Sequence, residues 1–137
     1  MTILLTELVA ALPRARVRGQ ADIKVEAITN DSRRVVPGSL FVAYRGVSAD
    51  GHDFVPQAVA RGAVAVVAEK RLRGLRVPLV VVPEGREALA HLSAAWRGYP
   101  SRQLTVVGVT GTDGKTTTCN LIHSILTAAG RRAGLVT

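Results

Sequence analysis

The 137-residue sequence is poor in cysteine, in aromatic residues and in long apolar runs. Its single cysteine, Cys119, cannot form an internal disulfide, which is typical of proteins in the reducing cytosol. No apolar run reaches the ~18 residues of a membrane-spanning helix. The first residues also lack the basic and apolar segments of a secretion signal. We therefore expect a cytoplasmic protein with no membrane partner.

Acidic residues are also scarce, because 18 Lys and Arg stand against 10 Asp and Glu and leave a net charge of +8. This excess indicates either an anionic partner (a nucleic acid, a phosphorylated small molecule or an acidic domain) or simply a solvated arginine-rich surface. Aromatic residues amount to 4%, too few for the stacking platforms of single-strand nucleic-acid binders. The arginines are also scattered along the chain, so we expect no nucleic-acid partner.

Hydrophobic residues make up 47% of the chain, which excludes disorder as its main state, and their spacing predicts an α/β fold. The first part is predicted to hold helices over residues 2–12, 54–61 and 84–96 and strands over residues 23–29, 40–44, 63–68 and 77–82. We therefore expect a first domain, residues 1–100, with a small sheet flanked by helices. A Gly-Tyr-Pro-Ser stretch at its end predicts a linker.

A different pattern fills residues 101–137. A strand over 104–109, a glycine-rich turn, a helix over 116–129 and a strand at 134–136 predict the opening β-α-β unit of a nucleotide-binding domain. A lone β-α-β unit cannot cover both faces of a parallel sheet. We therefore expect either that the chain is a truncated piece of a longer protein or that its final element pairs with a partner outside it.

The glycine-rich turn has the composition of a phosphate-binding loop. It reads Gly108-Val109-Thr110-Gly111-Thr112-Asp113-Gly114-Lys115-Thr116-Thr117-Thr118. Glycines let successive main-chain amides turn toward an anion, and the start of the following helix adds unpaired amides and a positive dipole end. Lys115 would bring a full charge to the phosphates, and the hydroxyl of Thr116 is a hard oxygen ligand suited to Mg²⁺.

Two residues of this loop depart from the simplest pattern. Val109 stands where the common P-loop form has a glycine. Asp113 places a carboxylate beside the expected phosphates, and like charges a few Å apart repel. The Asp113 side chain must therefore point away, cap the helix or approach the phosphates through Mg²⁺.

With this loop the chain resembles the Mur ligases, whose nucleotide loop reads T-G-T-[ND]-G-K-T-[ST]. The upstream half is similar to the MurE-type branch at Asp31-Ser32-Arg33, Pro37-Gly38-Ser39-Leu40-Phe41-Val42-Ala43, Gly46, Asp50-Gly51-His52-Asp53-Phe54, Ala58, Gly62-Ala63 and Tyr99-Pro100-Ser101. Much of this upstream set is shared with the MurF-type branch. Thr112 favours the MurE type, because MurF-type loops more often carry serine at that position.

The resemblance implies an ATP-dependent ligase of peptidoglycan synthesis. Such an enzyme adds a diamino acid, either diaminopimelate or lysine, to UDP-N-acetylmuramoyl-L-Ala-D-Glu through an acyl phosphate. The resemblance further implies that residues 1–100 bind the UDP-sugar and that residues 101–137 begin the ATP-binding domain. Because the family's central domain continues well past Thr137, we expect no ligase turnover from this chain alone. We also expect a monomer.

The resemblance also assigns roles to individual residues. Lys115 is the expected catalytic residue, and Thr116 is the expected Mg²⁺ ligand. The expected ATP contacts are Gly111, Thr112, Asp113, Gly114, Lys115, Thr116, Thr117 and Thr118. The expected contacts with the uridine-diphosphate part of the substrate are Asn30, Ser32, Val47, Ser48 and Ala49.

Several alternatives remain open at the level of sequence. A MurF-type ligase, or a basic P-loop module of another class that binds nucleotides or nucleic acid, also fits the loop. Ser32 could instead be a turn residue that caps its own backbone. His52 has no partner at a metal-binding or catalytic spacing, so we expect an ordinary loop residue there, and Cys119 reads as a packed thiol.

Overall fold

The computed structural model describes residues 1–137, and its chain divides into two units, Met1–Pro100 and Ser101–Thr137. The break between the units falls inside the Gly-Tyr-Pro-Ser stretch. None of the helices in either unit is long and apolar enough to cross a membrane.

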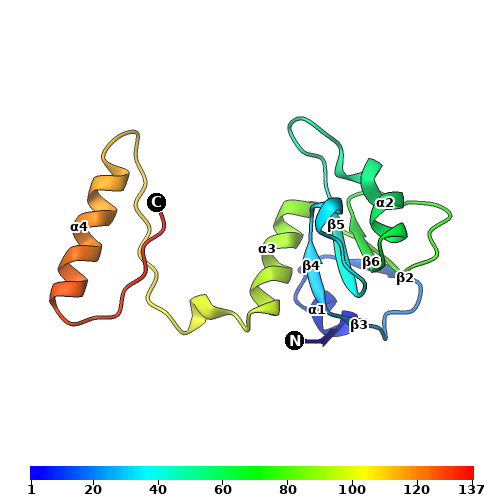
Figure 1. Ribbon diagram of the computed structural model, residues 1–137, viewed down its shortest axis with the longest axis horizontal. Coiled ribbons are helices and arrows are strands. Elements are labelled where there is room, and N and C mark those ends of the chain that lie inside the picture. The colour runs from blue at the N-terminus through cyan, green and yellow to red at the C-terminus, as the bar shows by residue number, and fades with distance from the viewer. The chain divides into compact units, whose positions relative to one another are not determined.

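The first unit is built on a five-stranded sheet with the order β2-β7-β6-β5-β4 (Figure 1). Its strands are β2 (Arg16–Arg18), β4 (Ala27–Thr29), β5 (Ser39–Ala43), β6 (Ala63–Ala68) and β7 (Leu79–Val81). Strands β4 to β7 run parallel to their neighbours, whereas β2 is antiparallel to β7. The carboxyl ends of the parallel strands therefore meet at one edge, where open α/β sheets bind their ligands.

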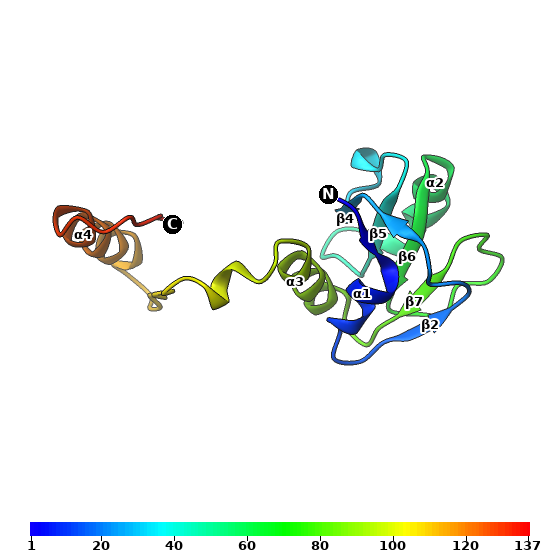
Figure 2. The same cartoon turned by 90° about the horizontal axis from the view of Figure 1, so that it is seen from below.

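Helices cover both faces of this sheet. Helices α1 (Leu5–Ala10) and α3 (Gly85–Trp96) lie side by side on one face, and α2 (Val55–Ala60) lies on the other (Figures 1 and 2). A two-stranded pair, β1 (Ile3–Leu4) with β3 (Lys24–Val25), lies outside the main sheet. Short 3₁₀ turns occupy Ser32–Arg34 and Gly51–Phe54.

The core explains why the central strands are apolar at every position except Ser39, the first residue of β5. Strand β5 is buried throughout, and its residues alternate between a core shared with α1 and α3 and a core shared with α2. Leu40 packs on the first side and Phe41 on the second. A parallel strand covered on both faces has no solvent-facing side, so an alternating polar pattern does not occur there.

Most element predictions in the first unit are confirmed, and the departures have clear causes. Strand β6 matches its predicted range, and α3 begins one residue later than predicted. The predicted strand 23–29 is divided between two sheets, because residues 24–25 pair with β1 and residues 27–29 pair with β5. Strand β2 escaped prediction because it contains one apolar residue, Val17, between two arginines.

The second unit contains one long helix, α4 (Lys115–Ala128), which matches the predicted helix closely, and a 3₁₀ turn at Pro100–Arg102. The strands predicted at 104–109 and 134–136 are wrong, since neither segment pairs with another strand. Their apolar side chains are largely exposed, including Leu104, Val106, Val107 and Val136. A strand requires a neighbour for its main-chain groups and cover for its apolar face, and this unit supplies neither. The overall α/β class is nevertheless confirmed by the first unit.

Candidate functional site

Two glycines shape the loop that leads into α4. Gly114 is the N-cap of the helix and has φ 72° and ψ 2°, a left-handed conformation that glycine adopts without strain. Gly111 has φ 153°. A Cβ atom built on Gly114 meets nothing within 4 Å, so the backbone conformation rather than crowding requires glycine there.

The main-chain amides of this loop are free. None of the amides from residue 111 to residue 117 donates a hydrogen bond within the protein. The first bond of the helix runs from the Thr118 amide to the Gly114 carbonyl at 2.9 Å, and no side chain caps the helix. Unpaired amides at the positive end of a helix dipole form an anion-binding site.

Lys115 folds its side chain back over the loop. Its Nζ atom donates to the carbonyl oxygens of Gly111, at 2.6 Å, and Thr112, at 3.1 Å. All of these groups are exposed, and no carboxylate neutralises the ammonium group. A full positive charge therefore lies on the same short loop as the free amides.

Oxygen atoms suited to a hard cation are present on the same turn. Thr116 and Thr117 are exposed, and their hydroxyls form no hydrogen bond within the protein. Asp113 is also exposed and does not cap α4, which eliminates one of the three arrangements considered for it. The chain contains no cluster of three or more His, Cys, Asp or Glu side chains that could hold a metal. The residues of this turn fit a polyphosphate, and Thr116 fits a single ligand position on Mg²⁺.

A second group of polar residues lies where the parallel strands of the first unit end. Asn30 follows β4, and its Nδ2 atom donates to the hydroxyl of Tyr44, which follows β5, at 2.8 Å. The guanidinium carbon of Arg86, from the first turn of α3, lies 5.5 Å from the centre of the Tyr44 ring. This arrangement adds Tyr44 and Arg86 to the candidate site. Their only sequence signal was their position at the end of a predicted strand and in the first turn of a predicted helix.

The predicted substrate residues lie at this edge in different states. Asn30 is exposed, as are Val47, Ser48 and Ala49 on the loop that follows β5. Ser32 is buried, and its hydroxyl donates to Oε1 of Gln57 on α2 at 2.8 Å. The structure therefore brings Asn30 and the loop to the ends of adjacent strands, whereas the Ser32 hydroxyl is already engaged in tertiary structure rather than in a local turn.

Asp31 and Arg33 form a local ion pair beside Asn30. The Asp31 carboxylate accepts hydrogen bonds from Arg33 through Nε at 3.0 Å, Nη2 at 2.9 Å and the main-chain amide at 2.9 Å. The side-chain bond to Arg33, followed by the amide bond, lowers the pKa of Asp31 from 3.8 to about 2. The same bond raises the pKa of Arg33 above its usual range.

His52 is not the ordinary loop residue expected from the sequence. Its side chain is only 4% exposed, and its Nδ1 atom pairs with the carboxylate of Asp50. Its Nε2 atom accepts the main-chain N–H of Glu69 at 3.1 Å. Hydrogen bonds from the amide and ring of His52, together with Lys70, hold the pKa of Asp50 well below its usual range. The expectation failed because one partner, Glu69, lies 17 residues away in the chain, and the other, Asp50, lies at no metal-binding or catalytic spacing.

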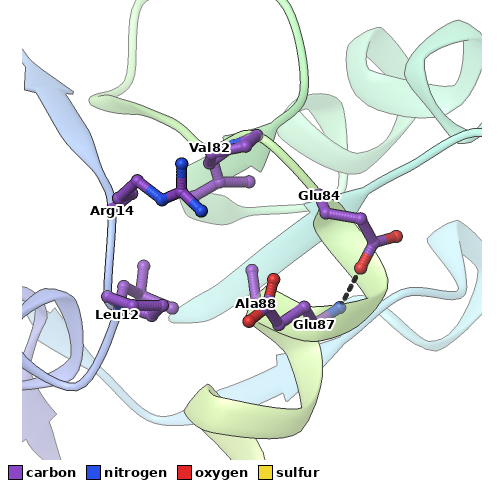
Figure 3. Close-up of a pocket in the computed structure, with 8 residues that line it drawn as sticks. Leu12, Arg14, Val82, Glu84, Glu87 and Ala88 are labelled. Atoms are coloured by element: carbon purple, nitrogen blue, oxygen red, sulfur yellow. Dashed lines mark hydrogen bonds between the residues drawn. The ribbon is translucent and has the colours of Figure 1, made fainter.

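The start of α3 differs from the start of α4 because carboxylates already occupy it. Glu84 accepts from the amides of Arg86 and Glu87, and the Glu87 contact is drawn in Figure 3. Glu69 accepts from the amide of Gly85 at 2.9 Å. The adjoining pocket, between Leu12, Val82 and Ala88, is only about 10 Å³ and cannot hold a ligand. The start of α3 therefore has its first amides paired with carboxylates, whereas the start of α4 keeps its amides free.

A family model described as "Mur ligase family, catalytic domain" matches residues 24–97, slightly more than half of the chain. A UDP-N-acetylmuramoyl-L-alanyl-D-glutamate--2,6-diaminopimelate ligase of Geobacillus thermodenitrificans is 47% identical over 132 residues. A UDP-N-acetylmuramyl-tripeptide synthetase of Deinococcus radiodurans is 49% identical over 136 residues. Each alignment covers 96% of this chain, and the chain spans only 27% and 28% of the length of these relatives.

Solved structures give the same picture. MurF from Acinetobacter baumannii superimposes with a TM-score of 0.73 at 31% identity, over 93% of this chain and 28% of its own. A UDP-N-acetylmuramoyl-L-alanyl-D-glutamate--2,6-diaminopimelate ligase gives 0.70 at 27% identity, over 96% and 27%. MurF ligase from Thermotoga maritima, solved in complex with ADP, gives 0.59 at 33% identity, over 76% and 24%.

Proposed function

Because the chain belongs to the Mur ligase family, we propose that it is part of an ATP-dependent ligase of peptidoglycan synthesis. The observation that carries this proposal is the loop before α4, whose amides are unpaired and whose Lys115 lies over it. Such a loop is suited to a polyphosphate. The ADP complex of a related MurF ligase adds support for a nucleotide in this family.

In this proposal the second unit binds the phosphates of ATP. The contacts are made by residues 111–118, with Lys115 on the phosphates and the hydroxyl of Thr116 on Mg²⁺. ATP supplies the energy for joining a carboxylate to an amine. The contribution of these residues would be to position the phosphates and to neutralise the charge that develops on them.

Lys115 has a further part in this proposal. In the free protein its ammonium group donates hydrogen bonds to the carbonyl oxygens of Gly111 and Thr112, at 2.6 and 3.1 Å. These bonds hold the side chain beside the amides, and phosphate oxygens would replace the carbonyls as stronger, charged acceptors. Asp113, which makes no bond to the helix, would remain on the solvent side or face the bound cation.

The first unit would bind the uridine-diphosphate part of UDP-N-acetylmuramoyl-L-Ala-D-Glu at the carboxyl edge of its parallel strands. Asn30, Ser32 and the loop residues Val47, Ser48 and Ala49 would contact it, with the Tyr44 ring beside them. Exposed Asn30 and the exposed loop are placed for direct contact. Ser32, whose hydroxyl proton goes to Gln57, could offer only its oxygen as an acceptor.

The MurE-type reaction, addition of a diamino acid as the third residue, is the member of the family that we favour. The named curated relatives of this type and the Thr112 of the loop support it. A MurF-type ligase is the second candidate, supported by the MurF structures that superimpose on this chain. If the chain binds UDP-N-acetylmuramoyl-L-Ala-D-Glu more tightly than the corresponding UDP-N-acetylmuramoyl-tripeptide, this preference would support the MurE type.

The nucleotide proposal is tested by titrating the chain with Mg²⁺–ADP in a calorimeter. The native chain is expected to bind, and Lys115→Ala is expected to bind at least about tenfold more weakly, since a charge-assisted contact is lost. Lys24→Ala, at an exposed lysine of β3, is the matched control and should bind like the native chain. Equal affinity of Lys115→Ala and the native chain would contradict the proposal.

A further inference from the structure

The loop that follows β5, residues 45–50, is held at both ends by one network of hydrogen bonds that includes His52 and Glu69. At its beginning, the amide of Arg45 donates to Oε2 of Glu69 at 3.1 Å. At its end, the carboxylate of Asp50 accepts from the His52 amide at 3.0 Å, from the His52 ring, and from Nζ of Lys70 at 3.1 Å. Arg45 and Asp50 also face each other as an isolated antiparallel bridge.

The middle of this loop has few constraints of its own. One internal hydrogen bond joins the Gly46 amide to the Ala49 carbonyl at 2.9 Å. The side chain of Val47 is 98% exposed and packs on nothing. The conformation of residues 46–49 therefore depends on how firmly Arg45 and Asp50 are held.

His52 connects the two ends of the loop. Its Nε2 atom accepts the Glu69 amide at 3.1 Å, so this nitrogen carries no proton, and the ring proton lies on Nδ1 and is donated to Asp50. The ring is nearly fully buried, so water cannot replace these partners. The neutral ring thus joins the Asp50 end of the loop to the end of β6.

Glu69 joins the same network to the next helix. Its second carboxylate oxygen accepts the amide of Gly85, the first residue of α3, at 2.9 Å. A Cβ atom on Gly85 would lie 2.5 Å from Cβ of Tyr44, so α3 and the end of β5 approach as closely as a glycine permits. One carboxylate therefore fixes the loop after β5 against both β6 and α3.

We propose that Glu69 and His52 are positioning residues that hold loop 46–49 in its binding conformation for the uridine-diphosphate part of a nucleotide sugar. This inference rests on the proposed function, in which that loop contacts the substrate. Ordering an exposed loop on binding costs conformational entropy of its backbone. A loop whose ends are held beforehand loses less entropy, and the affinity is correspondingly higher.

The test combines amide hydrogen exchange with calorimetric binding of UDP to the native chain and to Glu69→Gln. The glutamine has the same shape, but its single acceptor oxygen cannot serve both the Arg45 and the Gly85 amides. We expect the Arg45 and Gly46 amides to exchange about tenfold faster and UDP to bind about three- to tenfold more weakly. The amides within β6 should exchange as in the native chain. Glu7→Gln, at an exposed carboxylate on α1 without a partner, should leave both readouts unchanged.

Each outcome of this experiment decides something. Unchanged exchange at Arg45 and Gly46 in Glu69→Gln would overturn the proposal, as would faster exchange with unchanged UDP affinity. If the native chain fails to bind UDP, the assignment of the loop to the substrate fails, and the exchange data still decide whether the network holds the loop.

A second variant covers the case in which Glu69→Gln does not fold. His52→Asn keeps a donor near the Nδ1 position for Asp50 but loses the acceptor for the Glu69 amide. Faster exchange of the Arg45 and Gly46 amides and weaker UDP binding are again expected, with His91→Asn, at a half-buried helix position, as the control. Native exchange and native affinity in His52→Asn would refute the proposal.

Discussion

The two units differ in how far their candidate sites depend on a packed core. The first unit buries whole strands and places its polar groups through contacts between residues far apart in the sequence, such as His52 with Glu69. None of residues 101–137 is buried, and yet the loop before α4 has free amides, a left-handed glycine and a lysine folded over it. A turn with free amides can thus be formed by the local sequence, whereas the polar groups at the strand ends of the first unit are placed only by the complete fold.

The largest test of this comparison removes a large apolar side chain from each unit. Leu92→Ala, at a fully buried position of α3, is expected to destabilise the first unit by about 2–5 kcal/mol because it leaves a cavity. Ile125→Ala, at a position of α4 that is 60% exposed, should change stability by less than about 0.5 kcal/mol. Urea unfolding followed by circular dichroism measures both, and similar losses in the two variants would contradict the contrast.

Adding one methyl group tests close packing in the same way. Gly85→Ala would place a Cβ atom 2.5 Å from Cβ of Tyr44 and 3.3 Å from the Ala43 carbonyl. We expect the free energy of unfolding to fall by about 1–3 kcal/mol, since α3 and the end of β5 must move apart. Gly134→Ala meets nothing within 4 Å and should show no loss in the same urea titration. A Gly85→Ala chain as stable as the native one would mean that α3 can move away at little cost.

Two glycines with nearly equal φ angles can separate an effect on stability from an effect on nucleotide binding. Gly114 and Gly74 have φ angles of 72° and 73°, and both face open space. Alanine at either site is expected to cost about 1–2 kcal/mol, the penalty for a left-handed alanine. Only Gly114→Ala should also weaken Mg²⁺–ADP binding, by about tenfold, because it moves the amides that would meet the phosphates. Calorimetry on both variants checks this, and equal ADP affinities would remove Gly114 from the nucleotide site.

The smallest expected effect is a loss of stability of the first unit at low pH, where Asp31 becomes protonated. The pKa of Asp31 is lowered to about 2 by Arg33, so ionised Asp31 favours the folded state above its unfolded pKa, near ~4. This contribution is lost as the pH falls toward the folded value. Carboxyl titration by NMR should give a midpoint near about 2, and in Arg33→Ala the midpoint should rise because the side-chain bond is lost. A midpoint that does not move in Arg33→Ala would exclude this ion pair.

The sequence was most informative where the signal was local or strongly periodic. Strand β6 and helix α3 follow from apolar runs and spacing, and the loop before α4 follows from its glycines and lysine. The strands expected at 104–109 and 134–136 did not form. An apolar run indicates that a segment favours burial, but a strand also needs a neighbouring strand to pair with, and the run does not show whether one is present.

The edge of the first unit was harder to predict for a related reason. Asn30 was named from its turn and from the family resemblance, but its partner Tyr44 follows another strand, β5. His52 was expected to be an ordinary loop residue because Glu69 comes near it only through the parallel pairing of β5 with β6, and its neighbour Asp50 lies at no metal-binding or catalytic spacing. Residues whose roles depend on tertiary contacts carry no short-range spacing signal. Their contacts were therefore not predicted from the sequence.

The antiparallel edge of the main sheet has a consequence for how the chain folds as it is made. Strand β2 pairs with β7, and the register joins Arg16 to Val81. Residues 16–18 therefore cannot take their final place until nearly all of the first unit has left the ribosome. Long-range pairings of this kind slow folding, so β2 is expected to be among the last parts of the sheet to dock during translation.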